Sequence, residues 1–88
     1  MKQATVTIKN KVGLHARPAS LLMGVVNKYD CSVRLEKGDK SCEVKGLIDL
    51  MRLQCHYEDE LTIICEGADE EVCLEELTAL IDSKFGEN

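Results

Sequence analysis

Two basic side chains stand at an unusual place in this chain, just before a stretch in which apolar residues recur with helical spacing. In the segment GLHARPAS, His15 and Arg17 lie within the three residues before Pro18, which is the only proline of the sequence. The first-turn amides of a helix have no partners within the helix, and the helix dipole favours anions at that end. The start of the last predicted helix shows the usual arrangement, because two glutamates follow Asp69. The sequence therefore predicts a site at the start of the first helix that is open to an anion from outside the chain.

An imidazole at a positive helix end has a specific chemical use. The helix end disfavours the imidazolium form, and a neutral imidazole is a nucleophile. If His15 accepts a phosphoryl group, the amides of the first turn and the Arg17 guanidinium face an anion that they suit. Pro18 stiffens the first turn and has no N–H that would need a partner. The alternative interpretation is that His15 is a surface histidine at an ordinary loop–helix junction.

Five cysteines offer a second kind of chemistry. Their number is odd, no pair has Cys-x-x-Cys spacing and no export signal precedes them, so neither a disulfide framework nor a zinc site is expected. Cys55 and His56 are adjacent, which is a poor arrangement for chelation from a regular element. We therefore expect no metal and interpret Cys42, Cys65 and Cys73 as small core residues. A thiol or metal protein built on the five cysteines is kept as an alternative.

Length and composition restrict the class of protein. The chain has 88 residues, of which 44% are hydrophobic and 31% charged, and this predicts one globular domain over residues 1–88. A net charge of −5 argues against a general nucleic-acid binder, which needs a basic face. No apolar run could cross a bilayer and no signal sequence begins the chain, so we expect no membrane insertion and a cytoplasmic location. Because His56 is the only other histidine, we also expect no catalytic triad.

The hydrophobic pattern predicts seven elements that would position these groups. Their order is strand, helix, strand, strand, helix, strand, helix, which in so short a chain requires a sheet covered on one face by helices. The strands are expected near 4–8, 33–36, 41–45 and 61–65, and the helices over 16–28, 47–53 and from Asp69 to a stop signal at Gly86.

The short middle helix carries two kinds of apolar residue. Leu50 and Leu53 are expected to face the core, which leaves Leu47, Ile48 and Met51 on a more outward stripe. A docking surface and simple core packing are both consistent with this stripe, because a small domain exposes some apolar surface in any case.

With these elements in place, GLHARPAS resembles the active-site motif of HPr, the histidine-containing phosphocarrier family of the bacterial phosphoenolpyruvate-dependent sugar phosphotransferase system. The chain length, the element order, the turn EKGDK, the segment VKGLIDLMRL and the helix start EGADEE are also similar. The resemblance implies an α+β open-faced β-sandwich of βαββαβα order, in which three helices cover one face of a four-stranded antiparallel sheet.

The resemblance also implies a function. His15 would accept a phosphoryl group on Nδ1 from phosphorylated enzyme I and pass it to sugar-specific enzyme IIA domains. Arg17 would contact the phosphoryl group, and the backbone amides of Ala16 and Arg17 would bind it. Such a protein is a stoichiometric carrier rather than a turnover enzyme; it would need no cofactor and is expected to be a monomer. Partners would dock at Ser20, Leu47, Ile48, Met51 and Arg52.

Two positions depart from the family pattern. Many members carry a regulatory serine where this chain has Gly46, so phosphorylation at that position cannot occur. Asp49 places a carboxylate on the docking face, where it could weaken docking to an acidic partner or select a basic one. The alternative function is an HPr-like regulatory interaction module that acts by docking to partner proteins rather than by sugar phosphotransfer.

Overall fold

All seven predicted elements are present in the predicted order in the computed structural model, which describes residues 1–86. A short 3₁₀ turn, Lys84–Gly86, follows the last helix. No helix within residues 1–86 is long and apolar enough to cross a membrane. The elements are β1 (Lys2–Thr7), α1 (Ala16–Lys28), β2 (Ser32–Lys37), β3 (Lys40–Glu43), α2 (Leu47–Leu53), β4 (Glu60–Glu66) and α3 (Glu70–Asp82).

The four strands form one antiparallel sheet in the order β1-β4-β2-β3. Only β2 and β3 are strands that are neighbours both in sequence and in space; they form a hairpin at the turn EKGDK, in which Lys37 pairs with Lys40. Gly38 adopts a positive φ of 61° in the two-residue turn, a conformation that glycine adopts without steric cost. The last strand, β4, lies between β1 and β2 in the interior of the sheet.

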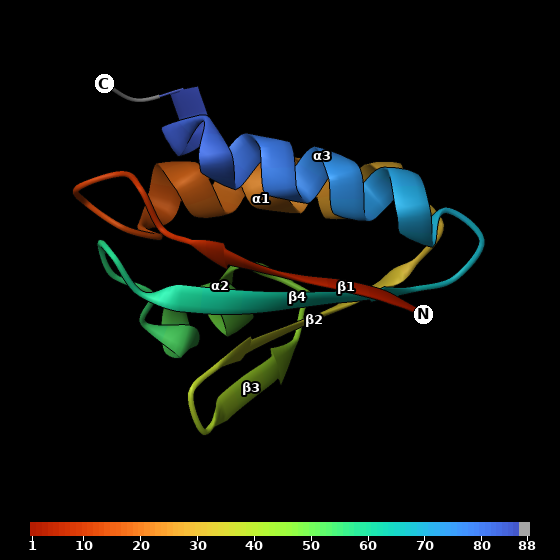
Figure 1. Cartoon of the computed structure of the whole chain (residues 1–88), viewed down its shortest axis with the longest axis horizontal. Helices are drawn as coiled ribbons and strands as arrows, with labels where there is room; N and C mark the ends of the chain where they lie inside the picture. The colour runs from red at the N-terminus through yellow and green to blue at the C-terminus, as the bar shows by residue number, and fades with distance from the viewer. Residues whose placement is uncertain (87–88) are drawn as a thin grey trace.

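The helices complete an α+β open-faced sandwich, as predicted. The long helices α1 and α3 lie side by side over the sheet, and the shorter α2 packs against α1 and β3 (Figure 1). The opposite face of the sheet is exposed, and there the hydroxyl groups of Thr5 and Thr62 form a cross-strand hydrogen bond of 3.0 Å. Alternation along the strands explains this arrangement, because successive side chains point to opposite faces.

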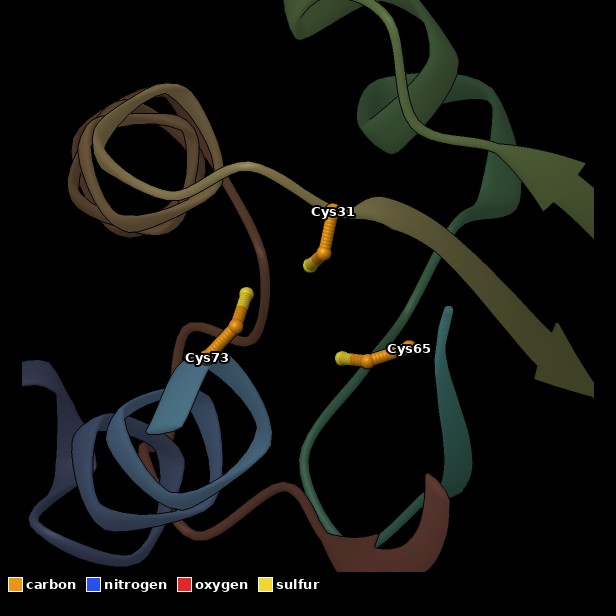
Figure 2. Close-up of side chains that lie close together, drawn as sticks. All are labelled: Cys31, Cys65 and Cys73. Carbon is orange, nitrogen blue, oxygen red and sulfur yellow. The ribbon is translucent and has the colours of Figure 1, made fainter. Parts of the chain in front are cut away.

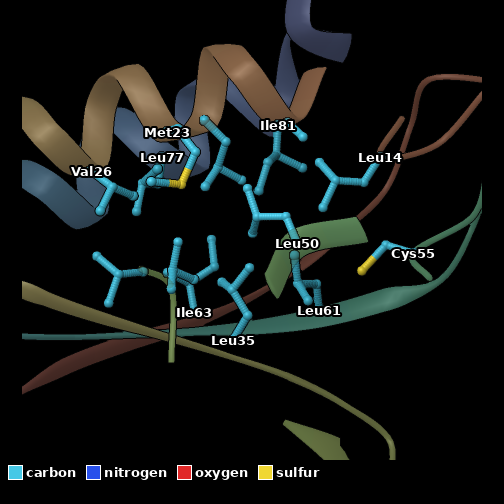
Figure 3. Packing of buried hydrophobic residues seen from close by; sticks show 14 of the residues in the cluster. Leu14, Met23, Val26, Leu35, Leu50, Cys55, Leu61, Ile63, Leu77 and Ile81 are labelled. Atoms are coloured by element: carbon cyan, nitrogen blue, oxygen red, sulfur yellow. The ribbon is translucent and has the colours of Figure 1, made fainter. Parts of the chain in front are cut away.

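The core between the sheet and the helices is largely aliphatic, because the sequence has only two tyrosines and one phenylalanine as aromatic residues. Figure 3 shows the side chains of Leu35, Leu61 and Ile63 rising from the sheet toward Leu77 and Ile81 of α3. All five are fully buried.

The two ends of α3 differ from the sequence expectation. Asp69 is the N-cap residue, but its carboxylate does not cap the helix: Oδ2 accepts a hydrogen bond of 2.8 Å from the backbone N–H of Asp30. At the other end, α3 stops at Asp82, four residues before the expected stop at Gly86. Phe85 lies in the 3₁₀ turn with a φ of 55° and is only 2% exposed, so burial of the single phenylalanine accompanies the early end of the helix. The last two residues of the segment KFGEN lie outside the described part of the chain.

Candidate functional site

His15 is the N-cap residue of α1. Its backbone is extended, with φ −91° and ψ −168°, and its carbonyl oxygen accepts the first helical hydrogen bond from the Ala19 N–H at 2.9 Å. The His15 side chain makes no capping hydrogen bond, and the first turn of α1 contains no acidic residue. The imidazole is half-buried, whereas Ala16 and Arg17 are exposed. The predicted helix N-terminus without its own carboxylate is therefore present, with His15 and Arg17 at it.

A tight loop fixes the backbone that leads into His15. Gly13 has a φ of 70°, and its N–H donates to the carbonyl oxygen of Asn10 at 3.1 Å. The buried Asn10 side chain returns a hydrogen bond from Nδ2 to the Gly13 carbonyl at 2.6 Å. Leu14 N–H then donates to the carbonyl oxygen of Cys55 at 3.0 Å. Because Cys55 lies two residues beyond the end of α2, this bond holds the start of α1 beside the end of α2.

The segment that carries Cys55 is itself anchored to the sheet. The backbone of Ile8 exchanges hydrogen bonds with Asp59 (2.9 Å) and Glu58 (2.8 Å), which continues the β1–β4 pairing. The Asp59 carboxylate accepts a hydrogen bond from the His56 backbone N–H and pairs with Lys37, and these contacts lower the pKa of Asp59. The segment that carries Cys55 is thus anchored where β1 and β2 end and β4 begins.

The outward stripe predicted for α2 is confirmed. Leu47, Ile48 and Met51 are 43%, 66% and 45% exposed, while Leu50 and Leu53 are buried. These apolar side chains lie on α2, which packs against α1, and the Cys55 carbonyl two residues beyond α2 accepts the hydrogen bond from Leu14, the residue before His15. The stripe is therefore part of the same surface region as the N-terminus of α1.

The remaining residues expected to dock partners are also accessible. Ser20 on α1 and Arg52 on α2 are exposed, and the two helices pack against each other. None of the predicted site residues is hidden in the core.

Gly46 is the N-cap residue of α2 and does not need to be glycine for steric reasons. Its φ of −162° is ordinary extended backbone, and a Cβ atom built there would meet nothing within 4 Å. A serine side chain would fit, so neither packing nor backbone strain enforces the departure from the family pattern.

Asp49 has a structural role that the sequence did not reveal. Its Oδ2 atom accepts hydrogen bonds of 3.0 Å from the backbone N–H groups of both Lys45 and Gly46. The carboxylate thus satisfies two backbone amides at the start of α2, as the side chain three positions after the N-cap does in a capping box. Asp49 therefore caps α2 in addition to adding negative charge to the docking face.

Replacing Asp49 by alanine is expected to lower the free energy of unfolding by about 1 kcal/mol, the usual effect of losing a helix cap. The matched control is Asp39→Ala, which removes the same charge from an exposed position in the β2–β3 turn. Urea denaturation followed by circular dichroism measures both. Equal destabilisation by the two substitutions would show that charge, and not the cap, is responsible.

The cysteines do not all behave as the sequence indicates. Cys65 and Cys73 are buried core residues as predicted, Cys42 is half-buried and packs against the core, and Cys55 is buried, which the sequence pattern does not predict. The spacing concealed one feature: the sulfur atoms of Cys31, Cys65 and Cys73 all lie within 4.8 Å of one another (Figure 2). Within residues 1–86 this is the only group of three or more side chains that could together hold a metal ion, and Cys55 and His56 form no such group.

The fold and the histidine at the start of α1 are those of a known class of protein. The family model described as "PTS HPr component phosphorylation site" matches residues 2–83. The chain is 37% identical over 83 residues to phosphocarrier protein HPr of Mycoplasma pneumoniae, covering 93% of this chain and 94% of that one. It is also 37% identical over 84 residues to the HPr-like protein Crh of Bacillus subtilis, covering 96% and 99%.

Solved structures agree. The structure of HPr-C-His from Thermoanaerobacter tengcongensis matches with a TM-score of 0.95 and 40% identity, over 100% of this chain and 99% of that one. An HPr dimer from the same organism matches with a TM-score of 0.77 and 40% identity, over 99% and 100%. The chain therefore belongs to the HPr family of the phosphotransferase system.

Proposed function

We propose that this chain is a phosphocarrier that accepts a phosphoryl group on His15 from phosphorylated enzyme I and passes it to sugar-specific enzyme IIA domains. The observation that carries the proposal is the half-buried imidazole at the N-terminus of α1, a helix whose first turn has no carboxylate. The protein acts in the cytoplasm as a monomeric domain that spans residues 1–88. It is charged and discharged in stoichiometric amounts, without a cofactor.

The transfer step needs only the groups at this helix end. A ring nitrogen of His15 (Nδ1 in the family) attacks the phosphorus atom of phosphorylated enzyme I. The new N–P bond forms as the bond between phosphorus and enzyme I breaks, and enzyme I keeps that electron pair. The phosphoryl oxygens then face the backbone amides of Ala16 and Arg17 and the Arg17 guanidinium, which are exposed. Charge-assisted hydrogen bonds from these donors stabilise the phosphorylated form.

Partner proteins dock on the apolar stripe of α2. Leu47, Ile48 and Met51 supply exposed apolar area, and Ser20 and Arg52 supply polar contacts beside it. Exposed aliphatic side chains that form one patch are typical of an interaction surface, whereas single exposed apolar residues are common on any protein. The hydrogen bond from Leu14 to Cys55 fixes this patch relative to His15, so a docked partner meets the imidazole in a defined position.

Substituting Ile48 by glutamate is expected to raise the KM of enzyme I for this chain about tenfold, because a buried charge replaces an apolar contact in the complex. Ile48 is the most exposed member of the stripe, so the melting temperature should change little. Val72→Glu is the matched control, because Val72 is also exposed, at 41%, but lies on α3. An equal rise in KM for both variants would contradict docking on α2.

The proposed function is tested with phosphoenolpyruvate, Mg²⁺ and enzyme I. Intact-mass measurement should show the addition of one phosphoryl group, which is lost in acid and retained in base, as expected of phosphohistidine. Addition of an enzyme IIA domain should then remove the group. A chain that enzyme I does not modify would contradict the proposal.

The similarity to the HPr-like protein Crh supports a second candidate, a regulatory module that acts by docking. The same surface of α2 would then bind a regulatory partner, and His15 would have no part in binding. The discriminating result is a partner that binds the wild-type chain and its His15→Ala variant equally well, together with no labelling by enzyme I.

A further inference from the structure

We propose that Cys31, Cys65 and Cys73 form a three-sulfur binding site for a soft metal cation, Cu(I). The three residues come from separate parts of the fold: the segment between α1 and β2, the end of β4, and the first half of α3. Figure 2 shows their side chains pointing toward a common centre, and all three sulfur atoms lie within 4.8 Å of one another. Metal–sulfur bonds of about 2.3 Å in a trigonal site place the sulfurs about 4 Å apart, so a small adjustment of the side chains suffices.

The backbone around the cluster is held in place before any cation arrives. Asp30, next to Cys31, receives a hydrogen bond of 3.1 Å from the Asp69 N–H at its carbonyl, and its own N–H donates to the Asp69 carboxylate at 2.8 Å. Asp69 is also the N-cap residue of α3, which carries Cys73. These two bonds fix Cys31 relative to Cys73, and this is the interaction that takes the Asp69 carboxylate away from capping α3.

Close packing at Gly67 holds the same region from the side of β4. A Cβ atom at Gly67 would lie 2.8 Å from the Cα atom of Cys31 and 2.9 Å from the carbonyl oxygen of Asp30. Cys65 of β4 pairs with Val33 of β2, so the two buried side chains lie on the same face of the sheet. A preorganised ligand set of this kind loses little conformational freedom on binding.

The donor set favours Cu(I) over Zn(II). Thiolate ligands select soft cations, and structural zinc sites take four protein ligands. In the part of the chain that the structure describes, no further cysteine, histidine or carboxylate joins the three sulfurs. Three sulfur ligands complete the coordination of Cu(I), whereas Zn(II) would need a fourth.

A cation can reach the cluster because Cys31 is only half-buried, while Cys65 and Cys73 are fully buried. Burial raises the pKa of the Cys65 thiol to about 11 and also raises the pKa of Cys73. In the metal-free chain Cys65 and Cys73 therefore pack in the core as neutral thiols. Each thiol that binds the cation as a thiolate releases its proton to solvent.

This site is separate from the proposed phosphoryl acceptor. His15 precedes α1 and Cys31 follows it, so the thirteen residues of the helix, about 20 Å in length, lie between them. The phosphocarrier proposal and the metal proposal can therefore fail independently.

The test is an anaerobic titration of the reduced full-length chain with Cu(I) in competition with bathocuproine disulfonate, followed by the ultraviolet absorption of sulfur-to-copper charge transfer. The wild-type chain is expected to take up one equivalent. Cys31→Ser should weaken binding more than about 100-fold, beyond the usual effect of losing only a partner of a metal ligand. Cys42→Ser is the matched control: Cys42 is also half-buried but lies outside the cluster, and its replacement should leave the affinity unchanged.

Circular dichroism and thermal unfolding check that both variants are folded. Equal Cu(I) affinity of wild type and Cys31→Ser would overturn the site. A parallel titration with Zn(II) tests the choice of metal: Zn(II) bound more tightly than Cu(I), with the same dependence on Cys31, would overturn the assignment to Cu(I).

Discussion

Replacement of His15 by alanine is expected to abolish phosphorylation of the chain by enzyme I and to leave its fold intact. Alanine has no ring nitrogen to form the N–P bond, and no other nucleophile stands at the N-terminus of α1, where Ala16 and Arg17 follow. The imidazole is only half-buried, and alanine keeps the backbone carbonyl that accepts the first helical hydrogen bond, so the free energy of unfolding should change by no more than about 1 kcal/mol. Intact-mass measurement after incubation with enzyme I, Mg²⁺ and phosphoenolpyruvate gives the result directly.

The chain supplies its own control, because it contains one other histidine. His56 is exposed and lies 3.6 Å from the Asp59 carboxylate. His56→Ala should be phosphorylated as the wild type is. Labelling that persists in His15→Ala and disappears in His56→Ala would move the acceptor to the loop after α2 and reject the proposed site.

The local elements of this fold could be predicted from the sequence because each is encoded by neighbouring residues. Alternation of Val33 and Leu35 marks a strand, and the spacing of the buried residues of α1 marks a helix whose observed bounds match the prediction. The order of the strands could not be predicted in this way. The insertion of β4 between β1 and β2 depends on contacts between residues far apart in the chain.

Polar side chains show a second limit, because composition indicates what a carboxylate can do and not which amide it meets. Asp69 stands at the expected N-cap of α3, yet the amide it binds belongs to Asp30, 39 residues away. The sequence indicates only a surface charge at Asp49, whereas its carboxylate accepts hydrogen bonds from the backbone N–H groups of Lys45 and Gly46 at the start of α2. In both cases the deciding contact depends on the position of a backbone N–H group in three dimensions.

The same distinction between local and long-range information applies to the candidate site. His15 and Arg17 could be identified because the motif that contains them is contiguous. The residues that hold this motif in place could not, since Asn10 and Cys55 act on it through hydrogen bonds across a loop. The cysteine cluster is the clearest example. Cys31 and Cys65 are 34 residues apart in the sequence, and their spacing does not indicate that their sulfur atoms lie close together.

Substitution of Gly13 by alanine is expected to destabilise the chain by about 3 kcal/mol and to lower its melting temperature by more than about 10 °C. Gly13 has a φ of 70°, which costs a residue with a Cβ atom about 1–2 kcal/mol. The new Cβ atom would also lie 2.5 Å from the carbonyl oxygen of Cys55 and 3.0 Å from the Cα atom of His56. The clash is with backbone atoms, so the loop must move rather than a side chain rotate.

That movement should also reduce phosphoryl transfer, because the displaced carbonyl of Cys55 is the acceptor for the Leu14 N–H immediately before His15. Gly24→Ala is the matched control: a Cβ atom there meets nothing within 4 Å, and Gly24 lies inside α1. Alanine at this helical position should stabilise the chain by about 0.8 kcal/mol, the opposite sign for the same chemical change. Thermal unfolding and the rate of labelling by enzyme I, measured on both variants below their melting temperatures, separate loss of stability from displacement of His15. A Gly13→Ala variant that melts and is labelled as the wild type is would show that contact with the segment after α2 does not position the imidazole.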